Sequence, residues 1–241
     1  TNGTHYKDLW DFSDTGSVGN ADGKEPYYAS LVFVGNKLYG FTEYGGAHND
    51  GTAFSLDTNG THYKDILDLD YTNSGEYLQG TPVFYNGKLF GCPDYGGPGG
   101  YGLVFSVDTN GANFTDLMDF SNGPEGGEPW ASLTRSGNTL YGTTYEGGTN
   151  SDGTLFSVDV DGNNFMVLHT FNGYDGYEAS ANDPLISNGV LYNMDYGGGK
   201  NYDGSIYRMI LCGLFKASQN TTDDKYNTCN DYSKMVASGE R

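Results

Sequence analysis

A period of 51 residues, present in four copies, constrains the fold of this chain more than any other feature. The tripeptide Leu38-Tyr39-Gly40 recurs in related form at positions 89, 140 and 191, each copy 51 residues after the one before. A second marker, Gly51-Thr52-Ala53-Phe54, returns at the same spacing from positions 102, 153 and 204. Self-similarity at a period of roughly 20 to 50 residues indicates an array of one supersecondary unit. A residue present in every copy is therefore better explained as scaffold than as a catalytic group.

Each repeat divides into four short strands. In the first copy, we predict strands over residues 28–34, 37–44, 52–56 and 61–69. Gly35-Asn36 and Asn59-Gly60 supply turn residues between them, and Asp50-Gly51 closes the longer loop. No 3.6-residue apolar rhythm is visible before residue 210. Four consecutive antiparallel strands per repeat are typical of a β-propeller blade.

The two ends of the chain predict how the propeller is completed. Residues Thr1–Asp8 match Thr58–Asp65, which form part of a fourth strand, whereas the last repeat has only three strands. We predict an all-β, four-bladed β-propeller over residues 1–210, closed by the N-terminal strand, with a non-repeated tail at 211–241. Closure removes exposed sheet edges. The expected blades are residues 13–69, 70–120, 121–171, and 172–210 completed by 1–12.

Two other arrangements fit the same ends. One is an open stack of four units. The other is closure by the N-terminal strand of a neighbouring molecule, which produces a polymer.

Charge and hydropathy limit the partners. A net charge of −19, from 31 acidic and 12 basic residues, repels phosphate backbones and anionic lipid surfaces. No apolar run approaches about 18 residues, so we expect neither nucleic acid binding nor membrane insertion. No signal peptide is visible, and the chain begins at Thr1 inside a repeat, so we expect a mature or trimmed product.

The repeat motif is similar to a known family. The pattern Leu-Tyr-Gly, Tyr-Gly-Gly, Gly-Thr-x-Phe-Ser and Asn-Gly, clearest in Leu38–Asp57 and Leu140–Asp159, resembles the bacterial tandem repeats called GloVer. The resemblance covers residues 1–210 and implies an exported, extracellular or cell-surface propeller. The fourth copy departs from the pattern at Asn193 and at Arg208-Met209.

Acidic residues recur in the loops that lead into the first strand of each blade. If that strand is innermost, these loops open beside the propeller axis. A ring of nearby carboxylates repels itself unless a cation or water network compensates it, so Ca²⁺ is the candidate ligand, and no other cofactor is expected. The alternative is four solvated carboxylates that point away from the axis. The predicted ring consists of Glu25, Glu76, Glu128, which sits one residue late, and Glu178.

Aromatic residues stand beside these carboxylates, in loops rich in Gly and Asn. Aromatic faces next to polar acceptors suit sugar recognition, because the apolar side of a pyranose stacks while its hydroxyls form hydrogen bonds. The alternative is packing between blades. The aromatic set is Tyr27, Tyr77, Trp130 and Tyr177.

Three Asp-initiated segments resemble fragments of a calcium loop, but they lack its later ligands and fall at expected hairpins, so we interpret them as turns. They are Asp57–Gly60, Asp108–Gly111 and Asp159–Asn163.

Signals for catalysis are sparse. None of the Gly-x-Ser-x-Gly, His-Glu-x-x-His or glycine-rich phosphate motifs is present. A paired-carboxylate glycosidase remains an alternative, because the repeats supply many Asp and Glu residues. Catalytic residues are expected to break the repeat, and the candidates that do so are His48, Arg135, Lys200 and Arg208.

The cysteines and the glycosylation triplets concern the class of protein. Cys92 falls in an expected inner strand and is interpreted as a buried apolar residue. A Cys212–Cys229 disulfide would fit export and stabilise the tail by roughly 3 kcal/mol, and two free thiols are the alternative. N-glycosylation triplets, as many as chance produces, begin at Asn2, Asn59, Asn113 and Asn220.

These observations favour a non-enzymatic binding or adhesion module outside the cell. Its expected partner is a glycan, a surface protein or another copy of the chain. A structural subunit of an extracellular filament, joined through the N-terminal strand or the tail, is one alternative. A carbohydrate-active hydrolase or lyase is the other.

Overall fold

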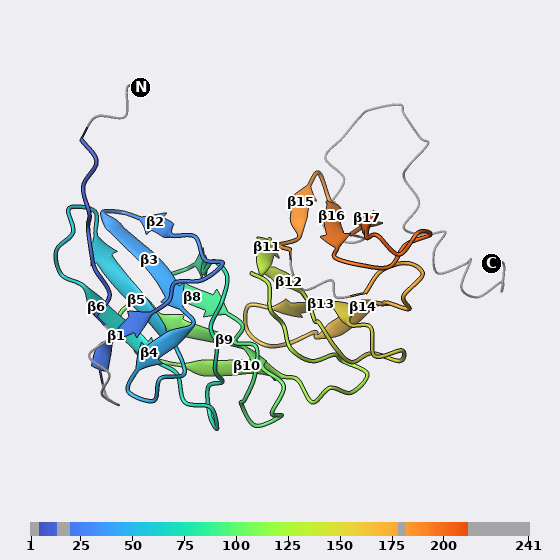
Figure 1. The fold of residues 1–241 in the computed structure, drawn as a ribbon, viewed down its shortest axis with the longest axis horizontal. Coiled ribbons are helices and arrows are strands. Elements are labelled where there is room, and N and C mark those ends of the chain that lie inside the picture. Colours follow the sequence, from blue (N-terminus) through green and yellow to red (C-terminus); the bar gives the residue numbers. More distant parts are fainter. Residues whose placement is uncertain (1–4, 14–19, 178–181, 212–241) are drawn as a thin grey trace.

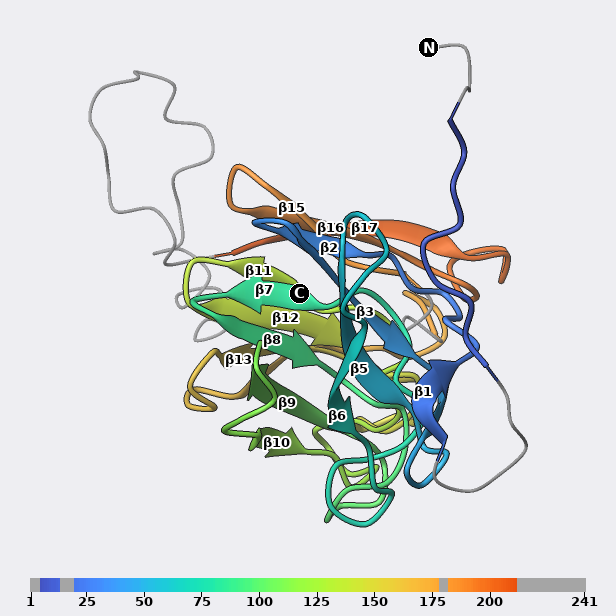
Figure 2. The same cartoon turned by 90° about the vertical axis from the view of Figure 1, so that its left-hand side faces the viewer.

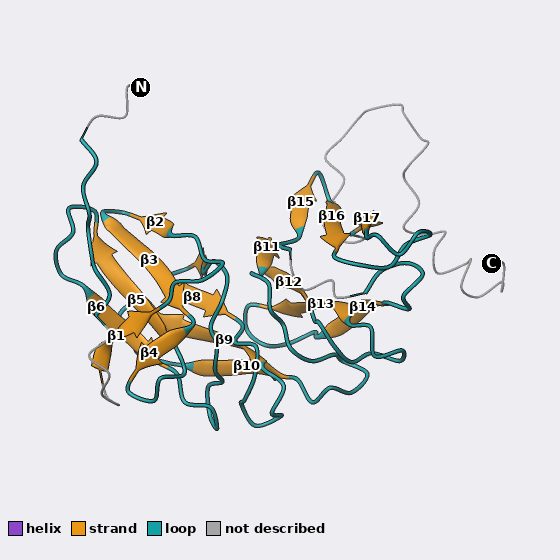
Figure 3. Cartoon of the chain, viewed as in Figure 1, coloured by secondary structure: helices purple, strands orange, loops and turns teal. Residues whose placement is uncertain are grey.

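The computed structural model describes residues 5–13, 20–177 and 182–211, and in these residues the regular structure is entirely β (Figures 1 and 3). The predicted all-β class is therefore confirmed. The described residues contain no helix long and apolar enough to cross a membrane.

Three repeats form four-stranded antiparallel sheets, and the fourth forms a three-stranded sheet. In each sheet the strands follow one another in chain order, as expected for propeller blades. The first blade contains β2 (Val32–Val34), β3 (Lys37–Thr42), β5 (Thr52–Asp57) and β6 (Lys64–Asp68). The second contains β7 (Val83–Tyr85), β8 (Lys88–Gly91), β9 (Leu103–Asp108) and β10 (Thr115–Asp119). The third contains β11 (Thr134–Ser136), β12 (Thr139–Thr143), β13 (Thr154–Asp159) and β14 (Met166–Thr170), and the last contains β15 (Leu185–Ser187), β16 (Val190–Asp195) and β17 (Ser205–Ile210).

A small sheet adds to the first blade. Strand β1 (Asn20–Lys24) pairs with β4 (Tyr44–Gly46). Single antiparallel bridges occupy the corresponding place in the other blades, for example between Glu76 and Tyr95. This pairing ties the loop before the first strand of a blade to the loop after its second strand.

The Asp-initiated segments form tight turns, as predicted. The backbone N–H of Gly60 donates to the carbonyl of Asp57 at 2.9 Å, and Gly111 and Asp108 form the same bond at 2.8 Å. The Asp57 carboxylate accepts a hydrogen bond from Lys37 Nζ at 2.7 Å. The aspartates of these turns therefore stabilise the hairpins.

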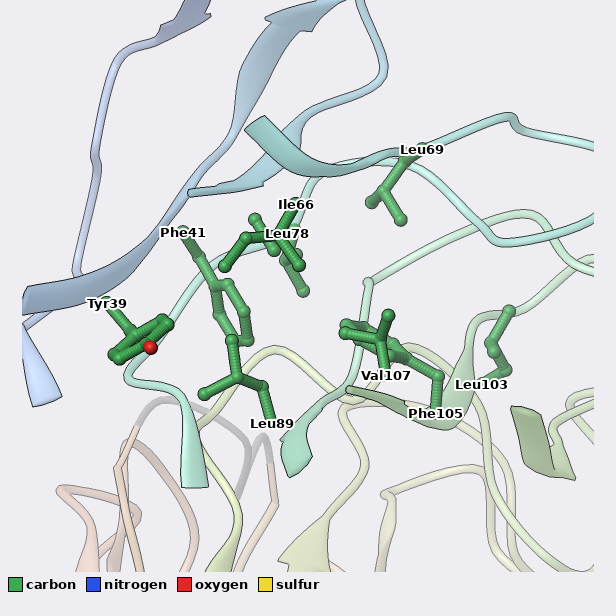
Figure 4. Packing of buried hydrophobic residues seen from close by; sticks show 10 residues of the cluster. Tyr39, Phe41, Ile66, Leu69, Leu78, Leu89, Leu103, Phe105 and Val107 are labelled. Atoms are coloured by element: carbon green, nitrogen blue, oxygen red, sulfur yellow. The ribbon is translucent and has the colours of Figure 1, made fainter. Parts of the chain in front are cut away.

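The core lies between neighbouring blades (Figure 4). Tyr39 and Phe41 of β3 pack in one buried cluster with Leu89, Phe105 and Val107 of the second blade. Two further clusters join the second blade to the third and the third to the last. The apolar positions that obey the 51-residue period are thus the positions that hold blades together.

One departure from the repeat has a packing explanation. A Cβ on Gly142 would lie 2.6 Å from the ring of Phe156, so this position needs glycine where a phenylalanine faces it. The last blade has Asn193 and Tyr207 at these two positions, and the Asn193 amide donates to the Tyr207 hydroxyl at 3.2 Å. The two changes compensate each other.

The N-terminal segment His5–Ser13 lies beside the first blade (Figure 2). The Phe12 ring lies 5.3 Å from Phe54 and 6.0 Å from Tyr63. In the same way, Phe120, which follows β10, lies 5.1 Å from Phe156 and 6.3 Å from Phe165 of the third blade. The segment therefore occupies, next to the first blade, the place of the outer strand of a preceding blade.

The described residues do not show the closed ring that the sequence predicts. Strand β17 pairs with β16, and no pairing between β17 and residues 5–13 occurs in this part of the chain. Figure 1 shows the last blade at the opposite end of the molecule from the N-terminal segment. The four units form an open arc.

Candidate functional site

The first strands of the blades meet through a series of hydrogen bonds at one end. The Ser30 N–H donates to Thr81 Oγ1 at 3.1 Å, the Thr81 N–H donates to Ser132 Oγ at 2.7 Å, and the Ser132 N–H donates to Asp183 Oδ1 at 2.9 Å. Each of these residues directly precedes the first strand of its blade. This series supports the expectation that the first strands are innermost and that the loops before them gather beside the axis.

Backbone geometry identifies which loop residues are equivalent. Glu25, Tyr77 and Glu128 all have positive φ, at 54°, 60° and 57°. The carbonyl of Glu128 accepts hydrogen bonds from the N–H groups of Trp130 and Tyr145, at 3.1 and 2.9 Å. The carbonyls of Glu25 and Tyr77 accept the same pair of bonds in their own blades.

Tyr77, not Glu76, therefore occupies the second position of the predicted ring. Glu76 lies one residue earlier and pairs with Tyr95 through the backbone. The late position of Glu128 in the sequence signalled this shift, because Glu25 and Glu128 follow one register and Glu76 follows another. The fourth predicted residue, Glu178, lies outside the described residues.

The three described glutamates differ in their surroundings. Glu25 is exposed and lies 3.7 Å from the ammonium of Lys24. Glu76 is half-buried, and burial, with a smaller contribution from the charge of Asp50, raises its pKa. Glu128 is 7% exposed, and its Oε2 accepts a hydrogen bond from the Tyr95 hydroxyl at 3.0 Å.

The described residues do not support the predicted calcium site. Within residues 5–13, 20–177 and 182–211, no group of three or more His, Cys, Asp or Glu side chains is arranged to hold a metal ion. The fourfold cation site stays a sequence prediction whose last member is not described.

Asp94 is the residue at this site that the sequence analysis missed. Its side chain is buried, at 2% exposure, and its Oδ1 has no hydrogen-bond partner. Burial, and then the charges of Glu43, Glu128 and Glu76, raise the pKa of this carboxyl well above its ordinary value. The available signal was its position in the loop after the second strand of the blade, where the first repeat has Glu43.

A row of aromatic rings crosses the first two blades beside these acids. The Tyr44 and Tyr77 rings lie 5.1 Å apart, and the Tyr77 and Tyr95 rings lie 5.9 Å apart, both edge to face. Burial raises the pKa of Tyr44 to about 12, so its phenol stays neutral. We call Tyr44, Tyr77 and Tyr95, with the carboxyls of Asp94 and Glu128, the aromatic band.

The other predicted aromatic residues divide between this end and separate positions. Trp130 stacks on Tyr145 at 4.3 Å, and its buried Nε1 has no hydrogen-bond partner. Tyr27 is exposed and lies against Tyr28. Tyr177 is half-buried and pairs with Gly197 through the backbone.

The candidates for catalysis do not come together. Arg135 lies over the ring of Tyr85, 4.0 Å from its centroid. His48 belongs to the first blade, and Lys200 and Arg208 belong to the last.

The remaining predicted residues are scaffold or surface positions. Cys92 is a free, buried cysteine, as expected, and its thiol donates to the Ala131 carbonyl at 3.0 Å. Asn59 and Asn113 are exposed. Residues Asn2, Cys212, Asn220 and Cys229 lie outside the described residues, so the disulfide and two of the glycosylation sites stay predictions.

A family model described as the Gloeobacter/Verrucomicrobia repeat matches residues 1–207 and 116–231 of this chain. The chain belongs to this repeat family. The resemblance predicted from the Leu-Tyr-Gly and Tyr-Gly-Gly motifs is confirmed. No curated protein matches this Gloeobacter/Verrucomicrobia repeat protein in sequence.

Solved structures similar to this repeat protein have propeller-like folds. A chain of a nidogen/laminin complex matches with a TM-score of 0.51 and 14% identity, covering 70% of this chain and 56% of that one. A puromycin-hydrolyzing peptidase of Mycobacterium tuberculosis has a TM-score of 0.51 and 14% identity, covering 84% of this chain and 30% of that one. TolB from Acinetobacter baumannii has a TM-score of 0.47. The repeat protein matches about half or less of the length of these chains, and the likeness concerns the fold alone.

Proposed function

We propose that this chain is a non-enzymatic binding module of the cell exterior, and that the aromatic band binds a neutral, hydroxyl-rich ligand such as a glycan. The observation that carries the proposal is the continuous series of rings from Tyr44 through Tyr77 to Tyr95, which ends at the buried Glu128 carboxylate. Aromatic faces beside fixed hydrogen-bonding groups are the chemistry that sugar recognition uses.

The charges around the band favour a neutral ligand. Glu43, Glu76 and Glu128 all act on the buried carboxyl of Asp94, and the net charge of the chain is −19. An anionic ligand would be repelled, whereas hydroxyl groups can donate to the carboxylates and accept from the tyrosine phenols. Export to the cell surface rests on the family resemblance and belongs to the same proposal.

We further propose that an N-terminal strand over Lys7–Phe12 completes the last blade, which gives four complete four-stranded units. The position of Phe12 against Phe54 supports this strand, because it repeats the position of Phe120 against Phe156. Lys7 Nζ donates to the Asn59 carbonyl at 2.5 Å, as Lys64 Nζ donates to that of Asn110 at 2.6 Å.

Binding is tested by titrating the protein with a panel of neutral hexose oligosaccharides in a calorimeter. Tyr77→Ala removes the central ring, and we expect at least one oligosaccharide to bind about 3- to 10-fold more weakly, the equivalent of roughly 0.5–1.5 kcal/mol. Tyr77→Phe keeps the ring and should bind nearly as wild type. Tyr174→Ala, an exposed tyrosine of another loop, is the surface control.

Two outcomes would contradict the glycan proposal. The first is wild-type protein that binds no member of the panel. The second is a Tyr77→Ala variant that is folded by circular dichroism and binds with unchanged affinity.

A further inference from the structure

The three internal contacts between blades use the same positions of the repeat. On the face that each blade turns to the next, three apolar or small side chains are buried, with exposures between 0% and 6%. In the first three blades these are Tyr39, Phe90 and Tyr141; Phe41, Cys92 and Thr143; and Ala53, Val104 and Leu155.

The last blade presents this face without a partner in the described residues. The equivalent side chains are Tyr192, Met194 and Ile206, and they are 38%, 47% and 79% exposed. Ile206 corresponds to Ala53, Val104 and Leu155, each 0% exposed, so the largest change falls at a position that is fully buried elsewhere. Exposed apolar surface of this extent is characteristic of an interaction site.

The first blade presents the opposite half of the same contact. Leu133 of the third blade packs against the second blade and is 4% exposed, whereas its equivalent in the first blade, Leu31, is 53% exposed. The Leu31 side chain lies beside Gly40, as Leu133 lies beside Gly142. Residues 7–12 already occupy the outer-strand place of the absent neighbour.

The two exposed faces are complementary, but within one chain they lie at opposite ends of the arc (Figure 1). The series of hydrogen bonds that starts at Ser30 ends at Asp183, and in the described residues it does not return to Ser30. We propose that the occupant of the last blade's exposed face is the first blade of a second copy, whose Lys7–Phe12 segment pairs with the outer edge of β17. This inference rests on the proposed completion of the last blade and assigns its strand to another molecule.

The register of this pairing follows from the first blade. There, Ala53 pairs with Leu67 and Ser55 pairs with Lys64. The equivalent pairs between copies are Ile206 with Trp10 and Arg208 with Lys7. The first pair joins two partly exposed apolar side chains, whereas the second opposes two like charges, which is unfavourable in a cross-strand pair.

Two variants that each break one half of the contact test the second copy directly. Ile206→Asp alters the last blade, Leu31→Asp alters the first, and both side chains are exposed in the single chain, so neither change removes a core contact. We expect wild-type protein to have at least twice the 26.1 kDa monomer mass by light scattering, and each variant alone to be a monomer. Mixing the two variants restores one intact contact and should give a dimer.

The control and the opposing results are equally specific. Met166→Asp, on the outer strand β14 at 58% exposure, should associate as wild type does. Wild-type protein that stays a monomer up to high micromolar concentration, together with a mixture that stays monomeric, would overturn the second-copy inference. Such a monomer with protected amides in both Lys7–Phe12 and β17 would leave the completed blade standing, because the chain would then close on itself.

The register has its own test. Arg208→Ser restores the serine of the other three blades and removes the charge opposite Lys7. We expect this variant to associate at a several-fold lower concentration than wild type, as measured by sedimentation. Unchanged association would contradict the assigned register.

Discussion

Asp195 is the clearest case in which one residue of the last blade changes the chemistry of the repeat. At this position the first and third blades have Thr42 and Thr144, whose hydroxyls each lie 3.0 Å from a second threonine hydroxyl. In the last blade, Ser205 donates to Asp195 Oδ2 at 2.9 Å, and Asp195 Oδ1 is buried without a hydrogen-bond partner. Burial raises the pKa of Asp195 from its ordinary value to about 7.

Asp195 should therefore make the stability of the protein depend on pH. A carboxyl whose pKa is higher in the folded state binds more protons when folded, so stability falls as pH rises between its unfolded and folded pKa values. We expect wild-type stability to fall between about pH 4.5 and pH 7, with a contribution from this group of at most about 1.4 kcal/mol per pH unit. Asp195→Asn, measured by urea denaturation across this range, should flatten the profile. A slope identical to that of wild type would show that Asp195 is ionised in the folded protein.

Single residues also mark where the sequence was and was not informative. The turns at Asp57–Gly60 and the burial of Cys92 follow from local chemistry and were predicted. The aromatic band was predicted only in part, because Asp94 and Tyr95 come from the loop after the second strand, and their nearness to Glu128 depends on how blades pack. The shift between Glu76 and Tyr77 depends on one inserted residue, which spacing alone assigns poorly.

At the level of elements, the contact between one blade and the outer strand of the preceding blade is repeated along the molecule. Phe120 is fully buried at such a contact, whereas Phe12, in the equivalent place beside the first blade, is only half-buried. The difference arises because no strand pairs with residues 7–12 in the described part of a single chain.

We expect Phe120→Ala to lower the free energy of unfolding by about 3–5 kcal/mol, because it removes a ring from a fully packed core. Phe12→Ala should cost less than half as much in dilute solution. Met166→Ala, at an exposed position, should change it by less than about 0.5 kcal/mol. Chemical denaturation measures all three, and equal costs for Phe12→Ala and Phe120→Ala in dilute protein would contradict the half-buried position of Phe12.

The sequence predicted the number of strands in each repeat better than their extent. The first expected strand of the first blade, over residues 28–34, is shortened to β2 at Val32–Val34. The sequence analysis expected a β-structure for the preceding residues, but Tyr28 has a φ of 51° and interrupts it. The pairing of β1 with β4 was not predicted, because the glycines of β4 carry no apolar alternation.

For the whole molecule, the 51-residue period establishes the arc of four units but does not determine its ends. Self-association has to overcome the net charge of −19 on each copy, so raising the salt concentration should strengthen it by screening this repulsion. The arrangement of the ends was left open by the sequence for a physical reason. The same pairing between an N-terminal strand and β17 can form within a chain or between chains.

Hydrogen exchange of the backbone amides tests most directly whether an N-terminal strand completes the last blade. At concentrations at which the protein associates, we predict that amides in Lys7–Phe12 and on the outer edge of β17 exchange about 100-fold or more slowly than in an unstructured chain. Dilution below the association range should remove this protection from both segments together. Exchange of both segments at the unstructured rate at every concentration would contradict the account.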